Sequence, residues 1–184
     1  MNYKNILTEV FEETQEFKHL GESVSYIPEL AKVNPNQYGV YLQTIKGESV
    51  GLGDYTTPFS IQSISKVFTL AMGFSILGEK LWDRIGVEPS GNRFNSIIQL
   101  EIEKGIPRNP LINAGAIVVS DILISHLRNP LKEYLEFVRR LSKCPNIDYN
   151  KSIAKSEKDY GYLNAAITNM LKHYGNINND IDDV

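Results

Sequence analysis

The sequence predicts an α/β protein that is mostly helical and contains one β-hairpin. Two strand-like segments, residues 38–45 and 48–53, are joined by a turn at Lys46-Gly47 and indicate the hairpin. Apolar residues recur at helical spacing through most of the remaining chain. With 184 residues, of which 42% are hydrophobic and 22% charged, the chain is long enough to enclose a sizeable core. We therefore expect a single domain over residues 1–184.

The first half of the chain predicts helices on both sides of the hairpin. An amphipathic helix is expected from Tyr3 to about Leu20, and Pro28 is expected early in a short helix or turn. After the hairpin, Thr57 is expected to cap a helix that has Pro58 as its first residue and ends at Gly78. The residues of this helix expected to face the core are Ile64, Val67, Phe68, Ala71, Phe74 and Leu77.

The second half predicts loops followed by three helices. Residues 86–113 are rich in glycine, proline and asparagine, whereas residues 114–127 are almost wholly apolar and predict a central helix. Asn129-Pro130 predicts the start of an amphipathic helix, and residues 160–173 predict the last full helix. The inward-facing residues expected in the amphipathic helix are Leu131, Leu135, Val138 and Leu141.

Composition excludes several classes of function. The net charge is −3 and the basic residues are scattered, so no nucleic-acid surface is expected. A single cysteine excludes an internal disulfide, and three histidines argue against a metal cluster. No membrane span is expected, because no run of about 18 uncharged apolar residues occurs. The first residues carry acids where a signal peptide is apolar, which predicts a cytoplasmic protein.

One lysine lies in an otherwise uncharged stretch, three residues after a serine. Ser63 and Lys66, in PFSIQSISKVF, are expected to project together from one helix face. A serine needs a base to become a nucleophile, and a lysine buried away from carboxylates can be that base because burial lowers its pKa. The alternative is a lysine that extends out of a core helix to solvent. A second S-x-x-K, Ser152 to Lys155, lies among charged residues and is interpreted as ordinary surface.

The wider context resembles the serine-dependent glutaminases, relatives of β-lactamases and penicillin-binding proteins in the S-x-x-K superfamily. The resemblance is carried by the blocks YIPELAKVNP, YGVYLQTIKGE, PFSIQSISKVF, GVEPSGNRFNS, GIPRNPLINAGAI and SEKDYGYLNAA. It implies a β-lactamase/transpeptidase-like fold and a homo-oligomer. It also implies hydrolysis of L-glutamine to L-glutamate and ammonia through a serine acyl-enzyme, without metal or organic cofactor. It also implies that Ser63 is the nucleophile and Lys66 its base. The substrate-binding residues it implies are Tyr26, Gln62, Ser63, Asn113, Glu157 and Asn164.

The residue types fit these roles, although each has a simpler alternative. A glutamate such as Glu157 suits the α-ammonium of glutamine, and the amides of Asn113 and Asn164 suit its polar groups. Glu157 and Asn164 are seven residues apart and would share a face of one helix. As alternatives, Asn113 would be a helix N-cap, Glu157 a first-turn acid and Asn164 a solvated or core-bonded amide. In the same way Tyr26 would be a packing aromatic and Gln62 a hydrogen-bonding group in the core.

The chain departs from the resembled family at its C-terminal end. Glutaminases are longer, and their later segment supplies further substrate-binding tyrosines and a strand near a K-S-G motif, which this sequence lacks. We expect the C-terminal sheet strands to be absent from this chain, and glutamine hydrolysis by the chain alone to be slow or absent. Two alternatives stay open. One is an inactive truncated paralogue that binds glutamine or oligomerises with a full-length subunit, and the other is a different S-x-x-K serine acylase.

Overall fold

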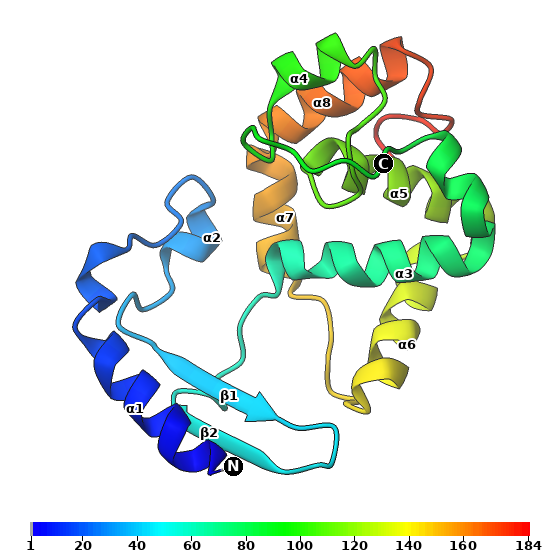
Figure 1. The fold of residues 1–184 in the computed structure, drawn as a ribbon. Helices are drawn as coiled ribbons and strands as arrows, with labels where there is room; N and C mark the ends of the chain where they lie inside the picture. Colours follow the sequence, from blue (N-terminus) through cyan, green and yellow to red (C-terminus); the bar gives the residue numbers. More distant parts are fainter. Residues whose placement is uncertain (1) are drawn as a thin grey trace. The chain divides into compact units, whose positions relative to one another are not determined.

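The computed structural model describes residues 2–184, which form two compact units (Figure 1). The first unit comprises the chain up to Ser60 together with Lys151–Tyr160. The second comprises Ile61–Asn150 and Gly161–Val184. Within residues 2–184 the structure is mostly helical with one two-stranded antiparallel sheet, as predicted. Whether residues 1–184 act as a single domain stays a prediction.

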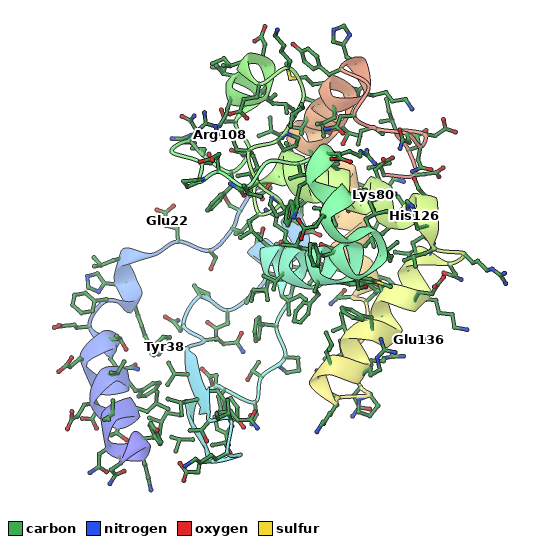
Figure 2. The ribbon with its side chains drawn as sticks, turned by 45° about the vertical axis from the view of Figure 1, so that its right-hand side comes forward. Glu22, Tyr38, Lys80, Arg108, His126 and Glu136 are labelled. Carbon is green, nitrogen blue, oxygen red and sulfur yellow. The ribbon has the colours of Figure 1, made fainter. Side chains whose placement is uncertain are left out.

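The first unit is built around the hairpin and the N-terminal helix. Strand β1 (Gly39–Gln43) pairs with β2 (Ser49–Gly53), and the helix α1 (Tyr3–Gln15) packs against both strands. Tyr38 lies between the helix and the hairpin (Figure 2), with its ring stacked on Phe11 and its hydroxyl 2.6 Å from Thr14 Oγ1. The predicted hairpin is confirmed. The predicted N-terminal helix ends early and is followed by a separate turn of 3-10 helix, Lys18–Leu20.

Two further helices complete the first unit. The short helix α2 (Pro28–Ala31), predicted from Pro28, packs against α7 (Lys151–Tyr160). The backbone N–H of Glu29 donates to the hydroxyl of Ser156, which is buried. Helix α7 was not expected, because its sequence is dominated by charged residues. It ends before Gly161, and a new helix, α8 (Tyr162–His173), belongs to the second unit.

The second unit is a helical body around one apolar core. The central helix α5 (Asn113–His126), predicted within one residue, packs against α3 (Ser65–Leu77) and α8, and α6 (Pro130–Ser142) packs against α3. The 3-10 segment Gly78–Asp83 and the short α4 (Ile97–Ile102) complete it. Its core residues are Leu81, Ile85, Leu100, Ile112, Ala114, Val118, Val119, Ile122, Leu123, Ile167, Leu171 and Ile177. None of the helices in residues 2–184 has the length and apolar character required to cross a membrane.

Two expectations for α3 are wrong. The helix does not begin at Pro58 but at Ser65, after a 3-10 turn, Gln62–Ile64; its predicted end at Gly78, with φ +57°, is confirmed. The expected inward face is wrong at most positions, because Ile64, Val67, Ala71 and Phe74 are exposed. Leu77, which was also expected inside, does pack against the core. The helix is apolar on all sides, so its sequence does not select the buried face. The side chains of α3 that pack against the core are Leu70, Met72, Ile76 and Leu77.

Helix α6 has the predicted start but a different buried side. The side chain of Asn129 caps it by accepting from the Lys132 N–H at 3.2 Å, as predicted. Val138 is buried, but Leu131 and Leu141, expected inside, are exposed. The residue one turn before Val138 on the buried side is Tyr134, which is half-buried and reaches α3. The predicted helical period was therefore right, while the assignment of its inner face was only partly right.

A buried carboxylate on α5 binds both Arg84 and the C-terminal segment. The Asp121 carboxylate is fully buried and accepts from the Arg84 guanidinium at 2.6 Å. It also accepts from the backbone N–H groups of Asn178 and Asn179, at 3.0 and 2.9 Å. Burial by itself raises the pKa of Asp121, but these hydrogen bonds together lower it below the ordinary value. A carboxylate with four donors around it is satisfied, so the charge stabilises this end of the core.

Candidate active site

Ser63 and Lys66 lie at the N-terminal end of α3. Ser63 is the middle residue of the 3-10 turn and is exposed, and Lys66 is the second residue of the helix and is half-buried. Because the turn runs directly into the helix, a spacing of three residues places both side chains on successive turns of one helical path. This backbone is compatible with the shared side that the sequence predicts, although the helix begins later than expected; that the two side chains project together stays a prediction.

The Lys66 amine is held by uncharged groups. Its Nζ donates to the backbone carbonyl of Leu111 at 3.1 Å and to Asn113 Oδ1 at 2.8 Å, and lies 5.8 Å from the centre of the Phe94 ring. Both hydrogen-bond acceptors are neutral. Burial lowers the pKa of Lys66 from the ordinary lysine value of 10.5. The Lys66 side chain thus turns toward the start of α5. The alternative interpretation, in which this lysine extends to solvent, is therefore not supported.

Asn113 connects Lys66 to a second amide. Its Oδ1 accepts from Lys66, and its Nδ2 donates to Asn164 Oδ1 at 2.9 Å. The N-cap position of α5 is Ile112, so the alternative that Asn113 caps the helix is wrong. Asn164 is the third residue of α8 and is exposed. Lys66, Asn113 and Asn164, which are far apart in the sequence, therefore form one continuous chain of hydrogen bonds.

The backbone immediately before Ser63 is strained. Gln62 has φ +46°, in the left-handed region that side chains other than glycine rarely adopt. Such a conformation costs on the order of 1–3 kcal/mol and is found most often at functional sites. Gln62 is exposed, so the alternative that it hydrogen-bonds inside the core is wrong.

Tyr26 and Glu157 belong to the first unit, whereas Ser63, Lys66, Asn113 and Asn164 belong to the second. Tyr26 is 70% exposed, which does not fit a packing aromatic, and Glu157 lies within α7 and is half-buried. The expectation that Glu157 and Asn164 share a face of one helix is wrong, because α7 ends at Tyr160 and Asn164 belongs to α8. The physical reason is the break at Gly161, a residue that readily leaves the helical conformation. The binding roles of Tyr26 and Glu157 stay predictions.

The second S-x-x-K provides an internal comparison. Lys155 is exposed and its Nζ donates to Asp159 at 2.6 Å, and this carboxylate raises the pKa of Lys155. Ser152 is also exposed. The same four-residue pattern thus occurs once with a half-buried lysine on neutral acceptors and once with a solvated lysine paired to an acid. Only the first has the lysine environment that a base requires, as predicted.

Two contacts of Lys66 were not identified from the sequence. The carbonyl of Leu111 and the ring of Phe94 both lie in the quoted blocks of residues 86–113, but nothing in their residue types marks them as neighbours of a lysine. The backbone N–H of Asn113 donates to the Phe94 carbonyl at 2.8 Å, which fixes this loop beside the start of α5. Among residues 2–184, no three His, Cys, Asp or Glu side chains are grouped so that they could hold a metal ion.

Known proteins that are similar to this chain in sequence and in fold are glutaminases. A family model described as Glutaminase matches residues 21–184. Glutaminases from Christiangramia forsetii and Saccharophagus degradans are 50% and 49% identical over this whole chain and 60% of their own lengths. Among solved structures, the probable glutaminase ybaS has a TM-score of 0.87 at 29% identity, covering 100% of this chain and 60% of that one. A probable glutaminase from Bacillus subtilis complexed with 6-diazo-5-oxo-L-norleucine has a TM-score of 0.80 at 27% identity, covering 100% of this chain and 55% of that one.

The matched residues and the folds together assign the chain: it belongs to the glutaminase family. The fold class predicted from the sequence is confirmed by the solved glutaminases that it resembles. The chain spans about 60% of the length of the curated relatives that it matches.

Proposed function

We propose that this chain supplies the nucleophile and the base of a glutaminase, which hydrolyses L-glutamine to L-glutamate and ammonia. The observation that carries the proposal is the Lys66 amine, which is half-buried, bound to two neutral acceptors and lowered in pKa. An amine of lowered pKa is neutral for a larger fraction of the time near pH 7, and only the neutral amine accepts a proton. The same pattern at Ser152 and Lys155 has no such environment.

The reaction proceeds through a serine ester. Neutral Lys66 removes the proton of the Ser63 hydroxyl as its oxygen attacks the side-chain carbonyl of glutamine. The tetrahedral intermediate collapses, the carbon–nitrogen bond breaks, and the proton held by Lys66 goes to the departing ammonia. Water then attacks the glutamyl ester, loses a proton to Lys66 and releases glutamate, after which Ser63 regains its proton. Every step uses proton transfer between groups of the chain and the substrate, without metal or organic cofactor.

The amides next to Lys66 are suited to recognise the substrate. Asn113 uses its Oδ1 and one N–H in the chain of hydrogen bonds that begins at Lys66, and Asn164 uses only its Oδ1. Each amide therefore keeps at least one N–H and one lone pair outside this chain. We assign their remaining groups to the polar atoms of glutamine. Gln62, next to Ser63 in the second unit, is assigned to the same binding set. Glu157 and Tyr26, in the first unit, are assigned to substrate binding from the resemblance to glutaminases, and the charge of Glu157 suits the α-ammonium of glutamine.

Covalent trapping tests the assignment of Ser63 without requiring turnover. 6-Diazo-5-oxo-L-norleucine has the carbon skeleton of glutamine with a diazoketone in place of the amide. We expect Ser63 Oγ to bond to the diazo carbon as N₂ leaves and the hydroxyl proton passes to that carbon. Mass spectrometry should show a gain equal to the reagent less N₂ on the peptide containing Ser63, and none in a Ser63→Ala variant. Ammonia release from L-glutamine is measured in parallel. A label on another residue, or an unlabelled Ser63, would contradict the proposal.

We also propose a cytoplasmic homo-oligomer. The support is the resemblance to glutaminases and the single cysteine, Cys144, which is free and exposed as expected in a reducing compartment. Light scattering coupled to size exclusion measures the assembly directly, and a mass equal to one chain at all concentrations would exclude self-association.

A further inference from the structure

The turn that carries the proposed nucleophile has weak local support. The N-cap positions of the 3-10 turn and of α3 are Ile61 and Ile64, whose apolar side chains cannot accept a hydrogen bond from the first N–H groups. The turn also contains the strained φ of Gln62. A strained, uncapped helix start keeps one geometry only when the surrounding structure holds it. Contacts from other elements are therefore needed to hold this turn in one geometry.

One such contact comes from α6. The Tyr134 hydroxyl donates to the backbone carbonyl of Ser65 at 3.3 Å. Ser65 lies between Ser63 and Lys66 and is the first residue of α3. Tyr134 is half-buried, and its pKa is raised to about 12, mainly by burial and secondly by the nearby Tyr149. The hydroxyl therefore keeps its donor proton at physiological pH. This hydrogen bond goes to the backbone between the two proposed catalytic residues and not to either of their side chains.

We propose that Tyr134 is a positioning residue, which fixes the start of α3 so that Ser63 and Lys66 keep a productive alignment. This inference rests on the proposed function of that pair. A second attachment of the same region is made by Lys66 itself, which donates to Leu111 and Asn113. Lys66 is anchored by its own bonds, whereas Ser63 lies on the strained turn, so loss of the Tyr134 bond mainly frees the serine.

The Tyr134→Phe variant removes the hydroxyl and keeps the ring. We expect the rate constant for acylation of Ser63 by L-γ-glutamyl-p-nitroanilide, followed by p-nitroaniline release, to fall about three- to tenfold, in line with one lost hydrogen bond. The substrate concentration at half-saturation should stay the same, because no binding group is changed. Amide hydrogen exchange of residues 61–69 should become faster in this variant.

Tyr149→Phe is the matched control. The Tyr149 hydroxyl donates at 2.8 Å to the carbonyl of Leu131, also on α6, and burial likewise raises the pKa of Tyr149. Its loss removes a comparable bond without touching α3, so acylation and exchange of residues 61–69 should stay as in the parent chain. Equal effects of the two variants, or an unchanged acylation rate in Tyr134→Phe, would overturn the positioning role. If L-γ-glutamyl-p-nitroanilide does not acylate the parent chain, the proposed function fails. Unchanged amide hydrogen exchange of residues 61–69 in Tyr134→Phe would separately exclude Tyr134 as the residue that holds this turn.

Discussion

Replacing Lys66 by methionine is expected to lower the rate of Ser63 acylation by about 10²–10⁴, the usual contribution of a general base. L-γ-Glutamyl-p-nitroanilide is the probe, because one p-nitroaniline is released for each acylated serine. Lys66→Arg should be as slow as Lys66→Met, since a guanidinium keeps a positive charge but does not lose its proton. The matched control is Lys155→Met, which removes the lysine of the solvated S-x-x-K and should acylate like the parent. Activity retained in Lys66→Arg would show that the amine acts only through its charge.

The same assay has a defined pH dependence. Acylation needs the neutral form of Lys66, so its rate should rise with pH and level off above the pKa of this amine. Because burial lowers that pKa, the plateau should begin below the ordinary value of 10.5. Asn113→Asp would place a negative charge 2.8 Å from the amine, which favours the ammonium and should move the rise to higher pH. A rate that does not change with pH in the parent chain would exclude a titrating lysine as the base.

Replacing Asp121 by asparagine is expected to lower the free energy of unfolding by about 3–5 kcal/mol at pH 7, the cost of breaking a buried ion pair on one side. The change leaves the Arg84 guanidinium without its charged acceptor and removes an oxygen that accepts from Asn178 and Asn179. Urea unfolding followed by circular dichroism measures it. The control is Glu136→Gln, whose pair with Lys132 is 3.9 Å long and exposed on α6 (Figure 2), and which should change stability by less than about 1 kcal/mol.

The pH dependence of stability follows from the same carboxylate. The pKa of Asp121 is lower in the folded than in the unfolded chain, so its contribution is fully present above the unfolded pKa and is lost as pH falls through the folded one. The parent chain should therefore lose more stability on acidification than Asp121→Asn, and the gap between them should narrow below about pH 4. A gap that stays constant down to acid pH would show that Asp121 contributes by shape and not by charge.

The sequence predicted the helices and strands best where one local signal dominates. The hairpin was predicted by its turn and alternating residues, and the start of α6 by its Asn129-Pro130 pair. The start of α3 was misplaced, because Thr57-Pro58 has the residue types of a helix start although the chain continues without helix to residue 61. Helix α7 was missed for the opposite reason, since its charged sequence has few apolar residues to reveal a buried side.

By itself the sequence determined the proposed catalytic pair and the family, since S-x-x-K in an uncharged stretch and the long blocks around it are local properties of the chain. Only the tertiary structure decided what surrounds the lysine. Leu111 and Asn113 accept from Lys66, and Asn164 accepts from Asn113, although all three are distant from Lys66 in the sequence. The reason is that a pKa depends on solvent and on charges within a few ångströms, and packing brings these together independently of their order along the chain.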